Sequence, residues 1–388
     1  MRIRRDNRRL ALVAWLGSGD SALLDGRRFV ISFHTFERLS FEKLPPSLKE
    51  RRPVAGEGTM RLAARTFVLV SASLALLAIS CGQPPHSGER YVFVSSNINI
   101  PYWQEAKAGF TDSAKDLSGA TAEFVGPARY APDEELKAFQ DAVASHPSGI
   151  LVSPGQADLF RDALDSAVAS GIPVICVDSD SPRSRRILFI GTDNYRAGLE
   201  SGTTMAEILH GHGRVVLVAI PGQHNEDERM RGVNDAIKKY PYMSVGNVVN
   251  DSGDVQQATD LVSGLIQNHT EIEGIICLEA SGGAGADKAL ESLSMAGKIP
   301  IVAMDANPDT LNLISSGGIS ATVAQKPYTM GYYGLQFLDD LHHNRVHEFP
   351  DWRTAPASPL PSVVDTGTVV VNSSDLQSFL AAIARPKP

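Results

Sequence analysis

The stretches Gly171-Ile-Pro-Val-Ile-Cys-Val-Asp178 and Gly297-Lys-Ile-Pro-Ile-Val-Ala-Met-Asp305 are two versions of one pattern. Each follows a predicted helix, which is itself preceded by a short apolar run, Gly149-Ile-Leu-Val152 in the first version and Gly274-Ile-Ile-Cys277 in the second. The two versions lie too far apart for a solenoid repeat, so they indicate two similar α/β lobes. Each lobe places an aspartate at the carboxyl end of a parallel strand, where ligands of open α/β sheets bind. The pattern therefore predicts two lobes that face one cleft.

Outward from these stretches, short apolar runs alternate with amphipathic segments. Such alternation implies parallel sheets with right-handed crossovers, so the predicted fold class is α/β with two Rossmann-like lobes. We expect strands over 91–95, 149–152, 173–177, 214–220, 245–249, 274–278, 300–304 and 319–323, and helices over 102–117, 134–145 and 157–170.

Three chain crossings are expected to join the lobes as a hinge. They are placed near Thr192–Asn194, near Gln325–Pro327 and near Thr354–Pro359. The first lobe would then take residues 91–193 and 326–353, and the second lobe residues 194–325 and 354–382.

The composition sets outer limits on function. The chain has 388 residues, of which 43% are hydrophobic and 21% charged, which suits a globular protein with two core-forming units. The net charge is −8, and the part after residue 90 lacks a basic block that could follow a phosphate backbone, which argues against nucleic acid as a partner. Three cysteines are too few for a disulfide scaffold.

The N-terminal part has the pattern of an export signal. A basic segment, Met60-Arg-Leu-Ala-Ala-Arg65, precedes the apolar run Thr66–Ile79, which is shorter than the roughly 20 residues of a membrane-spanning helix. Ala78-Ile-Ser-Cys81 resembles the lipobox of bacterial lipoproteins, in which the cysteine is acylated. An ordinary signal peptide or a single membrane anchor is the alternative. Residues 82–90 would be a polar linker, and residues 1–59 an upstream extension, non-native or disordered, with translation starting at Met60.

Polar and aromatic residues follow the first predicted strand, in Ser95-Ser-Asn-Ile-Asn-Ile-Pro101-Tyr-Trp103. A buried sugar site needs charged or amide groups for paired hydrogen bonds and aromatic faces for the C–H faces of the ring. It must also be dry enough that an unmade hydrogen bond costs roughly 1–3 kcal/mol. Tyr102 and Trp103 would supply the aromatic faces. The alternative makes them core residues in the first turn of the helix.

Several motifs in order resemble the type I periplasmic binding proteins for ribose and related sugars, which are substrate-binding proteins of ABC transporters. The resemblance runs from about Tyr91 to Ala382. It rests on Pro101-Tyr-Trp103, Gly171–Asp178, Ile190-Gly-Thr-Asp-Asn194, Arg229-Met-Arg-Gly-Val-Asn-Asp-Ala236, Met304-Asp305 and Thr322-Val-Ala-Gln325. The fold that it implies is the two-lobed periplasmic binding protein type I fold with a three-segment hinge.

The resemblance also implies a set of ligand-binding residues. Tyr102 and Trp103 would cover the ring faces, and Asp178 would bond hydroxyls from the first lobe. Arg229 would reach into the cleft from the second lobe, and Glu279, Asp305 and Gln325 would complete that side. Simpler roles remain open: Asp178 or Asp305 could cap the next helix. Arg229 could be a surface residue, and Gln325 could belong to the hinge.

Departures from the family pattern concern the identity of the ligand. Ile100 stands where an asparagine often precedes the proline, Ser179 replaces an arginine, and Glu279 and Ser153 each replace an asparagine. The site loses an arginine and gains a carboxylate, so it is net acidic unless a proton or the ligand balances the charge. We therefore expect a pentose other than ribose, a hexose or a polyol, or a ligand that carries an amine.

Other features of the sequence could suggest catalytic or metal-binding chemistry but lack the pattern that it requires. Ser281-Gly-Gly-Ala-Gly-Ala-Asp287 lacks the spacing of a nucleotide loop and is expected to form a tight turn into a helix beside Glu279. His210-Gly-His-Gly213 has no third ligand nearby, so no metal site is expected. Cys176 and Cys277 are expected to be buried free thiols in different lobes. With no recognisable nucleophile motif or cofactor loop, we expect a protein that is not an enzyme and needs no cofactor.

The expected function is the solute-binding part of an ABC importer. Ligand contacts from both lobes exist only in the closed state, so binding would shift the protein toward closure. The expected partners are a small sugar or polyol, a membrane permease, and the membrane itself through the lipid anchor of a monomer in the periplasm or cell envelope. A receptor that signals to a sensor kinase or chemoreceptor is the main alternative. A transcriptional regulator and an α/β enzyme are further ones.

Overall fold

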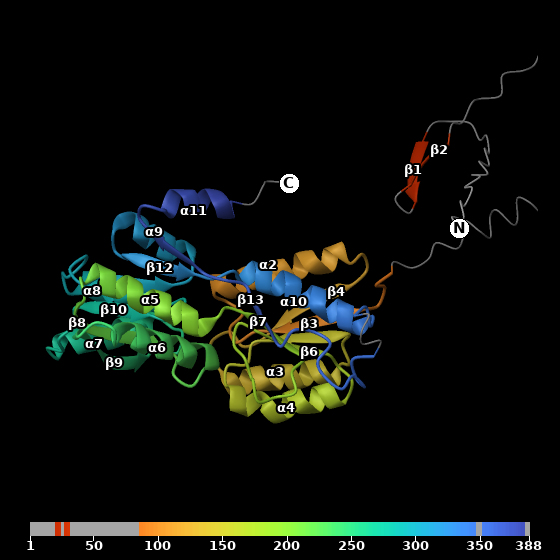
Figure 1. Ribbon diagram of the computed structural model, residues 1–388, viewed down its shortest axis with the longest axis horizontal. Coiled ribbons are helices and arrows are strands. Elements are labelled where there is room, and N and C mark those ends of the chain that lie inside the picture. The colour runs from red at the N-terminus through yellow and green to blue at the C-terminus, as the bar shows by residue number, and fades with distance from the viewer. Residues whose placement is uncertain (1–19, 25–26, 32–84, 347–350, 385–388) are drawn as a thin grey trace, which may run out of the picture. The chain divides into compact units, whose positions relative to one another are not determined.

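The computed structural model describes residues 20–24, 27–31, 85–346 and 351–384 (Figure 1). The chain divides into two compact units, residues 1–81 and 82–388. In the first unit, β1 (Asp20–Leu24) and β2 (Arg27–Ile31) pair as an antiparallel hairpin. The predicted signal segment Met60–Cys81, and with it the predicted lipidation site Cys81, lies outside the described residues. Within those residues, no helix combines the length and the hydrophobicity that a membrane span requires.

The first lobe is a parallel six-stranded sheet between two layers of helices. The strand order is β13-β7-β6-β5-β3-β4, and every pairing is parallel. α2 and α10 cover one face, and α3 and α4 the other (Figure 1). The bounds are β3 (Arg90–Val94), β4 (Thr121–Val125), β5 (Gly149–Val152), β6 (Val174–Val177), β7 (Leu188–Gly191), β13 (Val363–Asp365), α2 (Pro101–Asp116), α3 (Pro132–Ala144), α4 (Ala157–Ala169) and α10 (Pro327–His342).

The second lobe repeats this plan with one difference at its edge. Its strand order is β14-β12-β11-β10-β8-β9, and the edge strand β14 runs antiparallel to β12. α5 and α6 pack together beside the sheet, and α7, α8, α9 and α11 contribute to the other core cluster. The bounds are β8 (His212–Ala219), β9 (Tyr242–Asn250), β10 (Gly274–Cys277), β11 (Ile301–Met304), β12 (Ala321–Ala324), β14 (Val369–Asn372), α5 (Asn194–Ile208), α6 (His224–Ile237), α7 (Val255–Gln267), α8 (Gly282–Ser292), α9 (Pro308–Ser316) and α11 (Leu376–Ile383).

The central strands are buried along their whole length because helices cover both faces of each sheet. β5, β6 and β7 in the first lobe, and β10, β11 and β12 in the second, have only buried residues. Strands buried on both faces read as continuous apolar runs instead of alternating ones. The predicted α/β fold class with parallel sheets is confirmed. Cys176 in β6 and Cys277 in β10 are buried free thiols in different lobes, as expected.

Three crossings connect the lobes, and one of them differs from the prediction. The chain passes from β7 to α5 at Thr192–Asp193 and from β12 to α10 at Gln325–Lys326, near the expected positions. The third crossing lies between β13 and β14, not near Thr354–Pro359, because Val363–Asp365 pairs with β7 in the sheet of the first lobe. β13 has only three residues, and Val363 is exposed, so the strand carries little hydrophobic signal.

The repeated pattern gives the two lobes the same backbone geometry at one point. Asp178 follows β6 with φ +63°, and Asp305 follows β11 with φ +71°. The left-handed region is costly for most residues, but aspartate and asparagine tolerate it. The amide of Asp178 donates to the Ile190 carbonyl of β7 (3.1 Å), and that of Asp305 donates to the Val323 carbonyl of β12 (2.9 Å). Each aspartate is thereby fixed at the carboxyl edge of its sheet.

Candidate functional site

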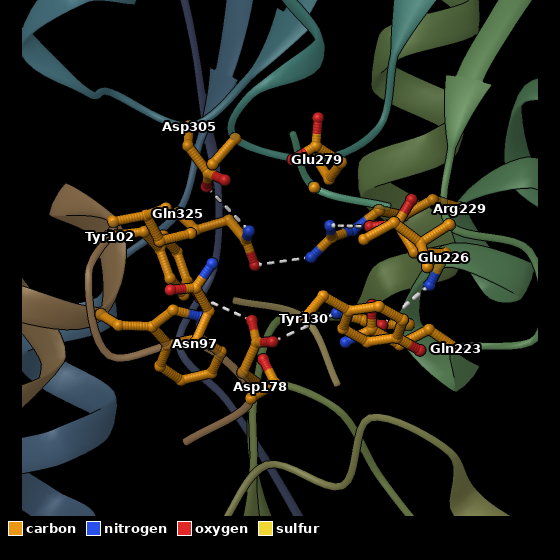
Figure 2. Close-up of a pocket in the computed structure, with 17 residues that line it drawn as sticks. Asn97, Tyr102, Tyr130, Asp178, Gln223, Glu226, Arg229, Glu279, Asp305 and Gln325 are labelled. Carbon is orange, nitrogen blue, oxygen red and sulfur yellow. Dashed lines mark hydrogen bonds and ion pairs between the residues drawn. The ribbon is translucent and has the colours of Figure 1, made fainter. Parts of the chain in front are cut away.

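A pocket lies where the carboxyl ends of the two sheets meet, and buried side chains of both lobes line it. Figure 2 shows Asp178 on one side and Glu279 and Asp305 on the opposite side, with Arg229 and Gln325 reaching between them. All seven residues proposed from the sequence line this one pocket: Tyr102, Trp103, Asp178, Arg229, Glu279, Asp305 and Gln325.

Asp178 holds hydrogen bonds from both lobes. The hydroxyl of Tyr102 at the start of α2 donates to its Oδ1 (2.5 Å), and Nδ2 of Asn225 at the start of α6 donates to its Oδ2 (3.1 Å). Asp178 is only 4% exposed, and this burial raises the pKa of its carboxyl despite the opposing charge of Arg229. The bond from Asn225 is a direct contact between the lobes, so Asp178 belongs to their interface as well as to the pocket.

Arg229 is the centre of a hydrogen-bond network within the second lobe. Its Nε donates to Asn194 Oδ1 (2.8 Å), its Nη1 to Glu226 Oε1 (3.1 Å) and the Leu278 carbonyl (2.7 Å), and its Nη2 to Gln325 Oε1 (3.0 Å). Burial alone would lower the pKa of Arg229, but the carboxylates of Glu226, Asp178 and Asp305 raise it above the usual value. With the side chain 2% exposed, the alternative that Arg229 is a surface residue is wrong. Among the described contacts, four of its five N–H donors are used, which leaves one on Nη2 for a ligand.

Glu226 lies beside Arg229 and was not predicted from the sequence. It is three residues earlier on α6 and only 1% exposed. Its Oε1 accepts from Arg229, and its Oε2 has no hydrogen-bond partner within the described part of the chain. Burial raises the pKa of this carboxyl well above its usual range. A buried carboxyl oxygen without a partner is costly, so Glu226 Oε2 is a position where a donor from a ligand would be stabilising.

Asp305 and Gln325 connect the pocket to a chain crossing. Gln325 Nε2 donates to Asp305 Oδ1 (2.8 Å), while its Oε1 accepts from Arg229 and from the Thr192 hydroxyl (2.7 Å). Thr192 and Gln325 each lie in one of the three crossings. Burial raises the pKa of Asp305 to about 7. Gln325 therefore lines the pocket and also lies in the hinge.

Glu279 lines the pocket, but its carboxylate is already used by the start of a helix. Its Oε2 accepts from the Ser281 amide (2.7 Å), and its Oε1 accepts from the Gly282 amide at the first residue of α8. A carboxylate at this place is favoured by the free amides of the helix N-terminus. The predicted tight turn into a helix beside Glu279 is confirmed. The role of Glu279 is thus at least partly structural.

The aromatic residues lie at the border between pocket and core. Tyr102 and Trp103 are in the first turn of α2, both buried, with their rings edge to face at 5.1 Å. Trp103 also packs edge to face on Phe93 of β3, at 6.0 Å. Both side chains belong to the core cluster of the first lobe as well as to the pocket wall.

The pocket also has residues that the sequence interpretation missed. Besides Glu226, its wall includes polar or aromatic side chains at three further places, the loop after β3, the loop after β4 and the start of α6: Asn97, Tyr130, Gln223 and Asn225. The signal for the last two was available, because they follow the buried strand β8 at the same carboxyl edge. Applying the strand-end rule to β8 would have found them.

Comparison with known proteins places the chain in a family. A family model described as the periplasmic binding protein domain matches residues 91–344. The chain is 25% identical over 292 residues to the ribose import binding protein RbsB of Bacillus subtilis (strain 168), which spans 72% of this chain and 93% of that protein. It is 23% identical over 274 residues to the D-allose-binding periplasmic protein of Escherichia coli (strain K12), covering 68% of this chain and 88% of the relative.

Solved structures agree with the sequence matches. The sugar-binding protein of a sugar ABC transporter from Bacillus halodurans is 33% identical, with a TM-score of 0.66 and coverage of 75% of this chain and 100% of the other. AraP, an arabinose binding protein from Geobacillus stearothermophilus, is also 33% identical, with a TM-score of 0.63 and coverage of 75% and 99%. The resemblance drawn from the sequence motifs is confirmed: the chain belongs to the periplasmic binding protein family, with its type I fold.

Proposed function

We propose that this protein is the solute-binding component of an ABC importer and that it binds a monosaccharide or a related polyol in the pocket between its lobes. The observation that carries the proposal is the composition of the pocket wall. Asp178 from the first lobe and Glu226, Arg229 and Asp305 from the second lobe line one pocket, and all four side chains are buried. Relatives whose names state a sugar ligand, such as the arabinose binding protein, support the choice of ligand class.

The polar groups fit a ligand that is rich in hydrogen-bond donors. Three carboxyl groups without helix-capping duties, those of Asp178, Glu226 and Asp305, face a single guanidinium with one donor left. Burial raises the pKa of each of these carboxyls. Neighbouring hydroxyls of a sugar or polyol would donate to the carboxyl oxygens, and the aromatic side chains would contact the C–H faces of the ring. A neutral ligand with many hydroxyl groups can form hydrogen bonds with these side chains without adding a charge to the pocket, whereas an amine would add a positive charge.

The mechanism is closure of the lobes around the ligand. Contacts from Asp178 and Arg229 to the same molecule exist only when the lobes are together, so ligand binding stabilises the closed state. The permease in the membrane then recognises the closed protein. We further propose that the protein works without catalysis, as a monomer. It would lie outside the cytoplasm, held to the membrane by an acyl group on Cys81.

Isothermal titration calorimetry with a panel of pentoses, hexoses, polyols and amino sugars tests the ligand class. We expect at least one neutral sugar or polyol to bind with a Kd in the micromolar range or tighter. Binding of ribose alone would contradict the expectation drawn from Ser153, Ser179 and Glu279. If no member of the panel binds, the ligand class itself is wrong.

The anchor is tested separately in cells. Mass spectrometry of the membrane-extracted protein should find acylated Cys81 as the first residue, and Cys81→Ser should release the protein from the membrane fraction. An unmodified Cys81 peptide from membrane-bound protein would contradict the anchor while leaving the sugar site untouched.

A further inference from the structure

A second cluster of titratable side chains lies at the far end of the first lobe from the pocket. His86 and Glu89 precede β3, while Asp339 and His343 lie on the last turn of α10 and just after it. One candidate ligand atom from each of these four residues, here called the His86 cluster, lies within 4.8 Å of the others. α10 starts beside the Gln325–Lys326 crossing and has 16 residues, so the cluster is about 24 Å from the hinge.

The contacts of His343 indicate that a positive charge is needed between its ring and a neighbouring carboxylate. Its Nδ1 lies 3.0 Å from the backbone carbonyl of Asp339 and 3.1 Å from Oδ1 of the same residue, and since both oxygens can only accept, Nδ1 carries the proton and donates. In a neutral imidazole the other nitrogen, Nε2, then presents a lone pair. Nε2 lies 2.9 Å from Glu89 Oε1, which is also an acceptor. Two hydrogen-bond acceptors at this distance repel each other unless a proton or a metal ion lies between them.

The ring of His86 also needs a positive charge between it and the neighbouring carboxylates. Its Nδ1 lies 2.9 Å from Glu89 Oε2 and 3.2 Å from Asp339 Oδ1, so one ring nitrogen points at two carboxylates. A single proton on Nδ1 can be well aligned with only one of these oxygens. A cation at the centre would serve both carboxylates and both imidazoles together.

We propose that the His86 cluster binds a divalent transition-metal ion of the Zn²⁺ type through His86 Nδ1, Glu89, Asp339 Oδ1 and His343 Nε2. Imidazole nitrogens and carboxylate oxygens are both ligands of Zn²⁺, and structural zinc sites are almost always four-coordinate. With bonds of about 2.0–2.1 Å, ligand atoms of a tetrahedral zinc are about 3.3 Å apart. The contacts of 2.9 and 3.2 Å within the cluster are near that spacing, whereas the more widely separated ligand atoms, which lie within 4.8 Å of one another, would move closer when the ion binds.

The surroundings hold the ligands in position. Tyr91 donates from its hydroxyl to Asp339 Oδ1 (3.0 Å), and Arg345 Nη1 donates to the other oxygen of Asp339 at 2.5 Å. The Asp339 carbonyl fixes the ring of His343, an arrangement typical of metal-bound histidines. Asp339 and His86 are buried, whereas the side chain of His343 is 27% exposed, which gives an ion a way in from solvent.

The proposed ion would tie the segment just before β3 to α10. His86 and Glu89 lie just after the segment that carries Cys81, so the metal would fix where the chain leaves the first lobe toward the proposed anchor. The cluster shares no residue with the pocket. We therefore expect the metal to stabilise the first lobe without changing the sugar affinity.

Zinc titration of the untagged full-length chain, stripped with EDTA, tests the proposal. Calorimetry with ZnCl₂ should show one site, and the melting temperature should rise with Zn²⁺ and fall again with EDTA. In the His86→Gln/His343→Gln variant, zinc binding should weaken about 100-fold or more, since loss of even a supporting group near a metal costs roughly 10–100-fold. His269→Asn is the matched control: it removes an exposed histidine at φ +57°, a conformation that asparagine accepts, and should bind zinc like the wild type.

The outcomes separate the metal from a cluster of protonated histidines. A melting temperature that depends on pH but not on Zn²⁺ would overturn the proposal, because protons alone would then balance the carboxylates. Unchanged zinc binding in the double variant would also overturn it, by placing the ion elsewhere. If the double variant melts early, the single His343→Gln variant decides, because this ring is partly exposed and its replacement disturbs the core less.

Discussion

Asp178 and Asp305 occupy matching places in the two lobes, yet their side chains have different partners. Both follow the second strand of the repeated pattern, both have positive φ, and both donate a backbone hydrogen bond to the next strand. The carboxylate of Asp178 accepts from Tyr102 of its own lobe and from Asn225 of the other lobe. The carboxylate of Asp305 accepts from Gln325 at the hinge. The repeated sequence thus fixes the backbone, and the elements packed against it decide the role of the side chain.

The two sides of the pocket differ in character for the same reason. The first lobe contributes one carboxylate beside two aromatic rings, and the second lobe contributes a network of charges around Arg229. We infer that the first lobe mainly provides the surface on which the ring lies. We infer that the second lobe would provide most of the groups that bond individual hydroxyls of a sugar.

Removing the centre of the second-lobe network should have the largest effect. Arg229→Met leaves the buried carboxyl of Glu226 without its partner, and we expect the free energy of unfolding to fall by about 3–5 kcal/mol. Urea denaturation measures this loss. The Arg229→Met/Glu226→Gln double variant should recover part of it, and Arg231→Met, at an exposed site on the same helix, should change stability by less than about 1 kcal/mol. An equal loss of stability in Arg229→Met and Arg231→Met would contradict the network.

Changing the first-lobe aspartate should affect binding more than folding. Asp178→Asn keeps the size of the side chain and tolerates the positive φ but removes the charge. We expect the affinity for the sugar to fall about 100-fold, which corresponds to roughly 3 kcal/mol from charged hydrogen bonds. Calorimetry measures the change, and Asp158→Asn at an exposed position of α4 serves as control. An affinity within threefold of the wild type would remove Asp178 from the site.

The raised pKa of Asp305 gives the ligand-free protein a pH dependence with a defined sign. The folded state keeps this proton up to about pH 7, whereas the unfolded chain releases it near its ordinary value of 3.8. Between these values the folded state binds more protons, so the free energy of unfolding should decrease as the pH rises from 4 toward 7. Asp178 and Glu226 act in the same direction. Chemical denaturation across this range should show a shallower slope for Asp305→Asn, and an unchanged slope would contradict the assignment.

Removing the hydrogen bond between Asn225 and Asp178, which joins the lobes, should have the smallest effect. Asn225→Ala removes the donor to Asp178 and should cost about 1 kcal/mol of closed-state stability. Small-angle scattering of the ligand-free protein should then give a larger radius of gyration, while the affinity changes less than tenfold. A strongly reduced affinity with unchanged scattering would mean that Asn225 contacts the ligand directly.

The parts of the fold that could be predicted are those that a local sequence pattern determines. Asp178 and Asp305 follow continuous apolar runs, so both their strands and their place at the sheet edge could be predicted. The third crossing could not, because β13 is short and half exposed and is held by its pairing with β7, a contact distant in sequence. A hydrophobic pattern carries no information on such a pairing.

The residues of the site likewise divide into those that the sequence predicts and those that it does not. Arg229 was found because its motif is distinctive, whereas Glu226 is an ordinary charged residue whose burial follows from the packing of α6 against α5 and the pocket. Glu279 was expected to bind the ligand, but its carboxylate turns back to the amides that start α8. Residue type and strand end predict that a side chain reaches the pocket edge. They do not predict which backbone group it meets there.

A crystal structure with the best sugar or polyol from the calorimetry panel tests most directly whether both lobes bind one ligand. We predict that the ligand accepts or donates hydrogen bonds shorter than about 3.2 Å with Asp178 on one side and with Arg229, Glu226 or Asp305 on the other. A ligand held by residues of a single lobe, with Asp178 still bonded only to Tyr102 and Asn225, would contradict this account.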